Sequence, residues 1–374
     1  MEQAKLGFGL MRLPTRNPND PGDIDIAQVN QMVDTFLQRG FTYFDTALMY
    51  CGSRSEEAVR EVLVKRHARD SFTLATKLHA GYLREKADPD RIFDEQRERT
   101  GVSFFDYYLL HDVNVQSLQV YDRLGCFDWL AEKKRAGLVR HMGFSFHDSA
   151  ELLDRVLTEH PEMEFVQLQI NYLDWDSMGV QSRRCYEVAT KHGKPVFVME
   201  PVKGGTLANV PQSVEDALRA CHADWSPSTW ALRFAAGLPN VKVVLSGMST
   251  LSQVEENTAT LAAAGPLSEV EQAVVREAVC ALNASVAIPC TGCAYCVQGC
   301  PRHINIPRAF SLYNTDRQEL AEKGWTPQHE LYENMTQVSG KASDCIGCGQ
   351  CERMCPQHLP IIQHLKTVAG HFEG

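Results

Sequence analysis

Two runs of cysteines near the C-terminus are the residues whose type and spacing point most clearly to chemistry. The first run is Cys290-x2-Cys293-x2-Cys296-x3-Cys300-Pro301, and the second is Cys345-x2-Cys348-x2-Cys351-x3-Cys355-Pro356. Three thiolates spaced two residues apart can close around one metal centre from a single loop. The repeated spacing therefore predicts two metal centres, whereas the other five of the 13 cysteines are scattered along the chain.

The spacing resembles that of bacterial ferredoxins, in which each run gives three ligands to one 4Fe–4S cluster and its fourth cysteine to the other cluster. This resemblance implies one cluster on Cys290, Cys293, Cys296 and Cys355, and a second on Cys345, Cys348, Cys351 and Cys300. Structural zinc sites or a disulfide framework are the alternatives, but zinc sites usually contain two close ligand pairs and often histidine. Thiolates free to bind metal imply a reducing compartment, so we expect a cytoplasmic protein.

Four polar residues in the first third of the chain form a second group. Asp45, Lys77 and His111 each end a short apolar run, and Tyr50 follows Asp45 in the next loop. Each has an ordinary explanation when taken alone, such as a helix cap, a packed ring, a solvated cation or a core histidine. Polar groups at the carboxyl ends of consecutive barrel strands, however, meet at one mouth of the barrel. The group therefore predicts an active site.

The elements that must position these residues follow from the apolar pattern before Cys290. Short apolar runs alternate there with longer stretches of helical periodicity, which is typical of a parallel sheet. The candidate strands are residues 6–10, 42–44, 72–76, 107–110, 141–144, 165–170, 195–199 and 241–245. Eight such units favour an α/β fold of the closed (β/α)8 TIM barrel type. An open doubly wound sheet is the alternative, although no strand is followed by the dinucleotide fingerprint G-x-G-x-x-G.

The length of 374 residues exceeds that of one ordinary domain. We expect the barrel in residues 1–266, a helical connector in 267–289 and a small, mostly helical, ferredoxin-like domain in 290–374. Residues 307–313 and 316–323 are predicted to be helices of the small domain. Because so small a domain buries little apolar surface, bound metal should supply part of its folding energy.

Charge and hydropathy exclude several classes of partner. The formal net charge is −10 and the pI is about 5.7, which argues against binding to nucleic acid or to an anionic membrane surface. The sequence contains no run of 18 apolar residues, so no membrane span is expected. The first 14 residues lack a basic segment followed by an apolar stretch, so we expect no secretory leader.

The order Asp45, Tyr50, Lys77 and His111, with Tyr50 in the segment Asp-Thr-Ala-x-x-Tyr-x-Gly, resembles the catalytic tetrad of the aldo/keto reductase family. The resemblance covers residues 5–265 and implies that Tyr50 protonates a carbonyl oxygen. It further implies that Lys77, paired with Asp45, lowers the pKa of the Tyr50 phenol, and that His111 orients the substrate oxygen. A phenol with a pKa near 10 donates poorly at neutral pH until a cation stabilises its anion.

The resemblance also implies where a cofactor would bind. Ser145, Gln169 and Asn171 stand where the family holds the nicotinamide carboxamide of NADPH or NADH. A phosphate site is expected in the turn after the last strand, and its candidate residues are Ser246, Gly247, Ser249, Thr250, Gln253 and Asn257. The phosphate there could belong to NADH, NADPH or FMN, or the segment could be an ordinary strand-to-helix turn.

The cofactor positions depart from the family pattern in four places. Phe146 stands where the family usually has asparagine, and Met199 stands where an aromatic ring usually stacks on the nicotinamide. Gln253 replaces an arginine that commonly binds the 2′-phosphate of NADP, and a lysine before the Ser-x-Thr segment is missing too. The loss of both cations weakens the expectation of NADP binding, because phosphate recognition depends on charge. Lys203, in a glycine-containing loop at the barrel mouth, could face an anionic group or be solvated.

The sequence is compatible with two functions of different classes. The first is a reductase for a small carbonyl or enone substrate, using NAD(P)H, electrons from the clusters, or both. A cluster passes one electron and a nicotinamide passes two as hydride, so a flavin such as FMN, and a ferredoxin or flavodoxin partner, would suit a route through the clusters. The second is an electron-transfer protein whose barrel binds a nucleotide or a partner without reducing a carbonyl itself.

Overall fold

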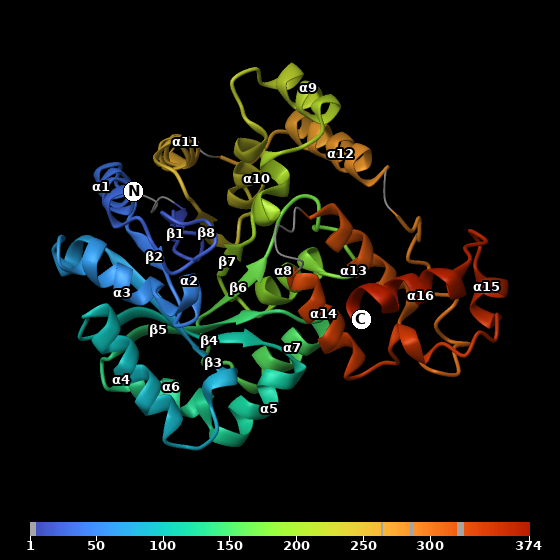
Figure 1. The fold of residues 1–374 in the computed structure, drawn as a ribbon, viewed down its shortest axis with the longest axis horizontal. Coiled ribbons are helices and arrows are strands. Elements are labelled where there is room, and N and C mark those ends of the chain that lie inside the picture. The colour runs from blue at the N-terminus through green and yellow to red at the C-terminus, as the bar shows by residue number, and fades with distance from the viewer. Residues whose placement is uncertain (1–4, 263–264, 285–286, 320–324) are drawn as a thin grey trace.

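The structure of the protein is a computed structural model that describes residues 5–262, 265–284, 287–319 and 325–374. Eight parallel strands close into a barrel in sequence order, which confirms the predicted (β/α)8 fold (Figure 1). The strands are β1 (Leu6–Gly9), β2 (Tyr43–Asp45), β3 (Thr73–His79), β4 (Phe105–Val113), β5 (Val139–Phe146), β6 (Phe165–Gln169), β7 (Val196–Met199) and β8 (Val241–Gly247).

Helices surround the barrel, and the red C-terminal helices lie together on one side of it (Figure 1). The helices of the barrel region are α1 (Ile26–Gln38), α2 (Tyr50–Ser53), α3 (Ser55–Val59), α4 (Asp88–Thr100), α5 (Val115–Leu124), α6 (Cys126–Arg135), α7 (Ala150–Glu159), α8 (Ser182–Lys191), α9 (Gln212–Cys221), α10 (Pro227–Ala236) and α11 (Leu251–Ala262). They are followed by α12 (Glu269–Asn283), α13 (Ile306–Gln318), α14 (Pro327–Thr336), α15 (Gln350–Met354) and α16 (Ile361–Phe372).

The barrel has a packed interior and an outer core between strands and helices. The interior is filled by a cluster of inward-facing side chains: Tyr43, Ala75, Leu109, Phe165, Phe197, Val243 and Leu245. Gly7 of β1 lies so close to this cluster that a Cβ there would sit 2.7 Å from a methyl group of Leu245. Since the interior is closed by side chains, the polar residues at the strand ends can meet only at the mouth.

The C-terminal region is helical, as predicted, and has a core of its own. That core includes Ile306 and Phe310 of α13, Leu331 of α14, Leu365 of α16, and cysteines of both runs. One prediction was wrong in detail. Residues 316–318 continue α13 and do not begin a second helix, because the helical backbone runs unbroken to Gln318. Residues 320–324 of that predicted helix lie outside the described residues.

The helical connector packs back on the barrel. Val275 and Ala278 of α12 share an apolar cluster with Leu218 of α9 and Trp230 of α10. The domain boundaries placed from the sequence stay predictions. Within the described ranges, no helix is long and apolar enough to cross a lipid bilayer.

Candidate active site

The four polar residues predicted to be catalytic meet at the carboxyl-terminal mouth of the barrel. Asp45 ends β2, Tyr50 begins α2, and Lys77 and His111 lie two residues before the ends of β3 and β4. Cys51, next to Tyr50, has φ of 51°, a left-handed conformation that non-glycine residues rarely adopt outside turns and functional sites. The tight turn at α2 thus places the Tyr50 ring beside the ends of two neighbouring strands.

Lys77 and Asp45 form a buried ion pair behind Tyr50. The Lys77 Nζ atom donates to Asp45 Oδ1 at 2.5 Å and to the Thr46 carbonyl at 2.9 Å, and it lies 4.8 Å from the centroid of the Tyr50 ring. Burial is the largest single effect and disfavours the charge of Lys77, but Asp45 and Tyr50 together outweigh it, so the pKa of Lys77 is raised. Burial raises the pKa of Tyr50, and the Lys77 charge opposes this shift. Tyr50 therefore keeps its proton at neutral pH.

His111 faces Tyr50 from the other side of the mouth. The two ring centroids are 5.9 Å apart and the ring planes are nearly perpendicular. Burial, followed by the charge of Lys77, lowers the pKa of His111 well below 6.5, so the imidazole is neutral. Its Nδ1 atom is buried without a hydrogen-bond partner among the described residues. A neutral ring with a free nitrogen can hold a substrate oxygen by a hydrogen bond without competing for the Tyr50 proton.

These pKa directions predict the pH profile of carbonyl reduction. The active form needs Tyr50 protonated, and its raised pKa keeps it so beyond the ordinary phenol value of about 10, whereas the lowered pKa of His111 keeps its ring neutral above the ordinary imidazole value of about 6.5. We therefore expect kcat/KM for reduction to be flat between those limits and to fall only on the alkaline side. A pH series measured with excess NADPH tests this; an inflection between pH 6 and 8 that disappears in His111→Gln would contradict it.

Ser145 and Gln169 offer the two polar atoms that a carboxamide requires. The Ser145 hydroxyl oxygen accepts the Asp112 backbone N–H at 2.7 Å, which leaves the hydroxyl proton available to a ligand. Gln169 donates its amide nitrogen to Asp174 at 3.2 Å, and its Oε1 atom is buried without a partner in the described part of the chain. One free donor and one orphaned acceptor fit the oxygen and nitrogen of a nicotinamide carboxamide.

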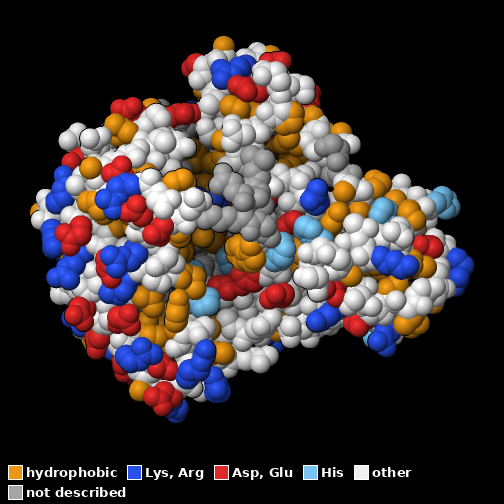
Figure 2. Space-filling view, in the orientation of Figure 1, with side chains coloured by type: hydrophobic (Ala, Val, Ile, Leu, Met, Phe, Trp, Pro, Cys, Tyr) orange, Lys and Arg blue, Asp and Glu red, His pale blue; other side chains and the backbone are white. Residues whose placement is uncertain are grey.

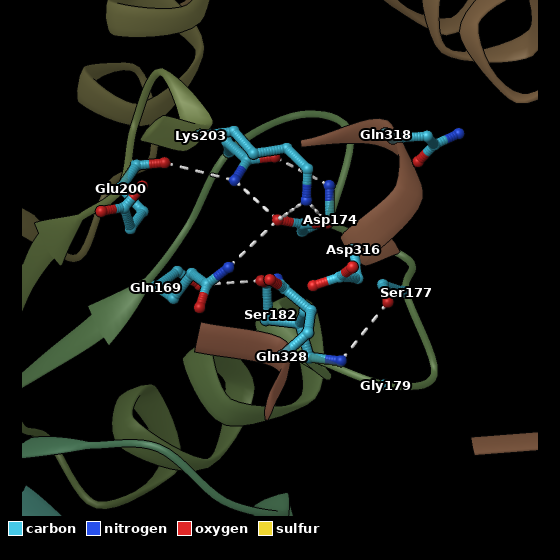
Figure 3. A network of polar contacts seen from close by, with 12 residues as sticks. Gln169, Asp174, Ser177, Gly179, Ser182, Glu200, Lys203, Asp316, Gln318 and Gln328 are labelled. Carbon is cyan, nitrogen blue, oxygen red and sulfur yellow. Dashed lines mark hydrogen bonds and ion pairs between the residues drawn. The ribbon is translucent and has the colours of Figure 1, made fainter. Parts of the chain in front are cut away.

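Asn171 and Lys203 both bind Asp174, and Figure 3 shows Lys203 beside Asp174. Lys203 Nζ lies 2.9 and 3.0 Å from the two Asp174 carboxylate oxygens, and both side chains are 1% exposed. The Asn171 amide donates to Asp174 at 2.9 Å and to the Glu200 carbonyl at 3.2 Å. The interpretation of Lys203 as a solvated residue is wrong, because its ammonium group is buried. The anionic group that it faces is the Asp174 carboxylate.

The turn after β8 is engaged internally. The Gln253 side-chain carbonyl accepts the backbone N–H groups of Ser249 and Thr250 at 2.7 and 3.2 Å, and Asn257 donates to the Ser246 hydroxyl at 3.1 Å. The Gln253 side chain therefore occupies backbone N–H groups at the start of α11 that a phosphate would otherwise use. A nearby cation comes from another loop: the aliphatic stem of Arg12 packs over Gly247, and the Ser249 hydroxyl donates to the Arg12 carbonyl.

The C-terminal domain contributes to the same mouth, which sequence reasoning missed. Glu330 of α14 accepts a hydrogen bond from the Asn114 amide at 3.1 Å, and burial together with Glu330 raises the pKa of Asp112 well above its usual value. Glu319, just after α13, packs on Gly204, and burial raises its pKa to about 7. Figure 2 shows acidic and histidine side chains gathered where the barrel meets this domain.

Two more polar side chains of the C-terminal domain are buried at this junction with unpaired atoms. Gln328 is fully buried, and neither of its amide atoms has a partner in the described residues. Arg308 reaches to 3.9 Å from the Asp148 carboxylate, but its Nε and Nη2 atoms make no hydrogen bond there. Because buried polar groups are normally satisfied, these atoms are suited to a bound molecule or to water.

The eight cysteines of the two runs gather in two groups. Cys290, Cys293, Cys296 and Cys355 line one hollow of the C-terminal domain, and Cys300, Cys345, Cys348 and Cys351 line another. Each group contains three cysteines of one run and the fourth of the other, which is the crossed arrangement implied by the sequence. Apolar side chains, Ile306 among them, border both hollows. Four thiolates in an apolar setting fit a 4Fe–4S cluster, and the ligand assignment stays a prediction.

Comparison with known families agrees with this geometry. The family model described as "Aldo/keto reductase family" matches residues 5–279. The chain belongs to the aldo/keto reductase family. A second model, described as "4Fe-4S dicluster domain", matches residues 289–360, so this aldo/keto reductase carries a C-terminal iron–sulfur domain. Both findings agree with the two resemblances drawn from the sequence.

Relatives of this aldo/keto reductase are distant. The "Uncharacterized oxidoreductase YqkF" of Bacillus subtilis (strain 168) is 22% identical over an alignment of 290 residues, and the match covers 69% of this chain and 87% of that protein. The "Acetyl-CoA decarbonylase/synthase complex subunit alpha 1" of Methanopyrus kandleri is 51% identical over 35 residues only. The match covers 9% of this chain and 5% of that protein, so it says nothing about the rest of either.

Solved structures share the barrel fold. The holo form of an aldo-keto reductase from Bacillus halodurans has a TM-score of 0.58 at 22% identity, covering 73% of this chain and 91% of that chain. An aldo-keto reductase from Klebsiella pneumoniae in complex with NADPH has a TM-score of 0.56 at 20% identity, covering 73% and 90%. At such identities the likeness shows the fold alone.

Proposed function

We propose that this oxidoreductase reduces the carbonyl group, or an activated C=C bond, of a small molecule bound between Tyr50 and His111. The observation that carries the proposal is the buried Lys77–Asp45 pair behind a protonated Tyr50, opposite a neutral His111. A bound NADPH or NADH would supply the hydride. This arrangement is suited to adding a proton to an oxygen as negative charge develops on it.

Each of the four residues at the mouth has a different role. His111 donates a hydrogen bond to the substrate oxygen and fixes its position. Tyr50 gives its proton to that oxygen, and the Lys77 ammonium stabilises the phenolate that is left. Asp45 keeps Lys77 charged in a site that burial would otherwise make unfavourable for a cation. In a ketone reduction the products would therefore be an alcohol, the oxidised nucleotide and a Tyr50 phenolate that must regain a proton from solvent.

The proposed NAD(P)H site is better supported at its nicotinamide end than at its phosphate end. Ser145 and Gln169 offer a complementary donor and acceptor for the nicotinamide carboxamide. At the phosphate end Gln253 already occupies the backbone donors, and the cation that the family usually has there is missing. We therefore propose that the chain binds NAD(P)H without a strong preference for the 2′-phosphate, with Arg12 supplying charge to the pyrophosphate.

Restoring the missing cation tests the phosphate site. In Gln253→Arg the backbone donors of Ser249 and Thr250 are released and a guanidinium is added, so we expect the Kd for NADPH to fall about tenfold while that for NADH changes little. Fluorescence titration with both nucleotides measures this. Gln253→Ala is the control, since it releases the same donors without adding charge. Equal changes for NADPH and NADH would place the 2′-phosphate elsewhere.

We further propose a role for the two clusters. Each 4Fe–4S cluster would supply single electrons, so we propose a ferredoxin or flavodoxin as the outer partner and a flavin such as FMN as the mediator where two electrons must be combined. In the conservative version the clusters only hold α13 and α14 over the mouth. In both versions the unpaired Gln328 and Arg308 atoms support a ligand bound between the two domains. We place the protein in the reducing cytoplasm.

An electron-transfer protein is the second candidate, because Gln253 blocks the phosphate donors and Phe146 replaces a family cofactor residue. Anaerobic reduction separates the candidates. We would add NADH, NADPH or dithionite to the purified protein, with and without FMN, and follow cluster absorbance and the EPR signal. Bleaching by a pyridine nucleotide would put the clusters on the electron path. Turnover of a carbonyl substrate without any bleaching would support hydride chemistry with structural clusters, whereas no turnover would favour the carrier.

A further inference from the structure

Three side chains from three helices of the C-terminal domain converge away from the cysteines. Asp316 lies near the end of α13, His329 in the first turn of α14 and His371 in the last turn of α16. Each can offer one ligand atom, and these atoms all lie within 4.8 Å of one another. Neither the cysteine spacing nor the catalytic tetrad accounts for this cluster.

The Asp316 carboxylate is the centre of the cluster. It is buried, accepts a hydrogen bond from the Thr326 hydroxyl, and lies 2.5 Å from Nε2 of His371. His329 Nδ1 lies 3.5 Å from Asp316 Oδ1 and 3.5 Å from the Thr326 hydroxyl, both too long for good hydrogen bonds. Among the described residues, no lysine or arginine forms an ion pair with Asp316. Within the described part of the chain, the buried carboxylate is thus faced by two imidazoles and the Thr326 hydroxyl.

Aromatic neighbours fix the orientation of both imidazoles. The Tyr313 ring packs perpendicular to His371 at 5.2 Å, and the Phe372 ring packs perpendicular to His329 at 5.0 Å. The two histidine side chains are still 21% and 26% exposed. The cluster is therefore held in place on its inner side and open to solvent on its outer side, which leaves a route for an ion and room for water.

We propose that Asp316, His329 and His371 bind one divalent transition-metal ion, a third metal site distinct from the two clusters. Two imidazoles and one carboxylate suit Zn²⁺ or Fe²⁺, and a set of three protein ligands leaves a position for water. The hydrogen bond from Thr326 orients the carboxylate, as partners of metal ligands commonly do.

The distances in the structure fit a site that closes on an ion by a small movement. With metal–ligand bonds of about 2.0–2.2 Å, tetrahedral ligand atoms lie roughly 3.3 Å apart. The 3.5 Å between Asp316 Oδ1 and His329 Nδ1 is close to this spacing. His371 Nε2 lies 2.5 Å from the other carboxylate oxygen, Oδ2, so the His371 ring must move away from Oδ2 when an ion binds. The His371 ring would then carry its proton on Nδ1, so that Nε2 is free to bind the ion.

An ion at this site would join α13, α14 and α16. It would tie the last helix to the two helices that contact the barrel, and α14 carries Glu330 and Gln328 at the barrel mouth. Figure 3 shows Asp316 near the loop that carries Asp174 and Ser177, and Ser311 of α13 receives a hydrogen bond from Gly179 of that loop. The metal would therefore stabilise the docking of the iron–sulfur domain on the barrel.

Metal analysis of the cluster-loaded protein tests the proposal. The protein, purified anaerobically, is incubated with Zn²⁺, passed over a desalting column with a weak chelator, and analysed for zinc and iron. We expect one zinc ion per native chain. We expect at least a tenfold lower zinc content in His329→Ala and in His371→Ala, with unchanged iron, because each variant loses a direct ligand.

Two further variants keep the test decisive. His364→Ala removes a histidine of α16 that is outside the cluster, and it should retain the zinc of the native protein. His371→Gln keeps a donor for Asp316 but is a poor ligand, so it should lose zinc even if His371→Ala disturbs folding. The proposal is wrong if the native chain retains no zinc, or if the cluster variants retain as much as His364→Ala, as zinc bound to cysteine thiolates would.

Discussion

Turnover of a carbonyl substrate is expected to fall by about two to four orders of magnitude when Tyr50 is replaced by phenylalanine, because the proton donor is lost. The ring itself would remain in its place beside Lys77 and His111. Substrate and nucleotide affinity should change little, since the hydroxyl acts mainly as charge develops on the substrate oxygen. Steady-state kinetics with NADPH and a panel of aldehydes, ketones and enones measures the effect, and cluster absorbance shows whether the fold is intact.

Tyr43→Phe is the matched control for this variant. Tyr43 lies on β2, two residues before Asp45, and its hydroxyl is buried without a hydrogen-bond partner among the described residues. Removing it deletes the same group from the same barrel but takes no proton from the mouth, so activity should be retained. If Tyr50→Phe were as active as Tyr43→Phe, the barrel would not be a carbonyl reductase, and the electron-carrier function would gain support.

The parts of the site that the sequence predicted lie where short stretches of chain set the geometry. Asp45, Lys77 and His111 each lie at or near the carboxyl end of a strand, and the carboxyl ends of parallel barrel strands meet at one mouth. The pattern of apolar strands therefore predicted both the barrel fold and the common location of the tetrad residues. The cysteine ligands could be predicted for the same reason, because the spacing within each run determines which thiolates can share a loop.

The parts that the sequence did not predict depend on contacts between distant segments. Lys203 could have been solvated or paired, and only the fold brings it to Asp174, 29 residues earlier in the chain. Glu319 and Glu330 belong to a domain whose docking on the barrel is set by packing between α13, α14 and the mouth. No periodicity or motif in residues 305–336 encodes that docking, and a glutamate on a helix is ordinarily a solvated group.

This docking changes how the mouth should be understood. In a bare barrel the mouth is open to water, and a substrate is selected by the strand-end loops alone. Here Glu330 adds a carboxyl group beside Asp112, whose raised pKa keeps it protonated at neutral pH, so the iron–sulfur domain changes both the charge and the hydrogen-bonding groups at this edge of the mouth. Selectivity among carbonyl substrates should therefore depend on the iron–sulfur domain even if its clusters never transfer an electron.

Loss of iron from paired cysteine variants is the second result with a large expected effect. Removing one ligand of a 4Fe–4S cluster should release that cluster, and part of the folding energy of the domain with it. Cys293→Ala and Cys355→Ala should each contain about half of the native iron, as should Cys300→Ala. Cys280→Ala is the control, because Cys280 lies exposed on α12 outside both runs and should leave the iron content unchanged.

Combining these substitutions distinguishes a crossed from an uncrossed ligand arrangement. In the crossed arrangement Cys293 and Cys355 serve one cluster, as their shared hollow indicates, so Cys293→Ala/Cys355→Ala should still contain half of the iron. Cys300 lines the other hollow, so Cys293→Ala/Cys300→Ala should contain almost none. An uncrossed arrangement reverses the two results, since Cys293 and Cys300 belong to the same run. The crossing matters for folding, because a cysteine from each run in each cluster makes the two loops interdependent and couples α15 to the segment that precedes α13.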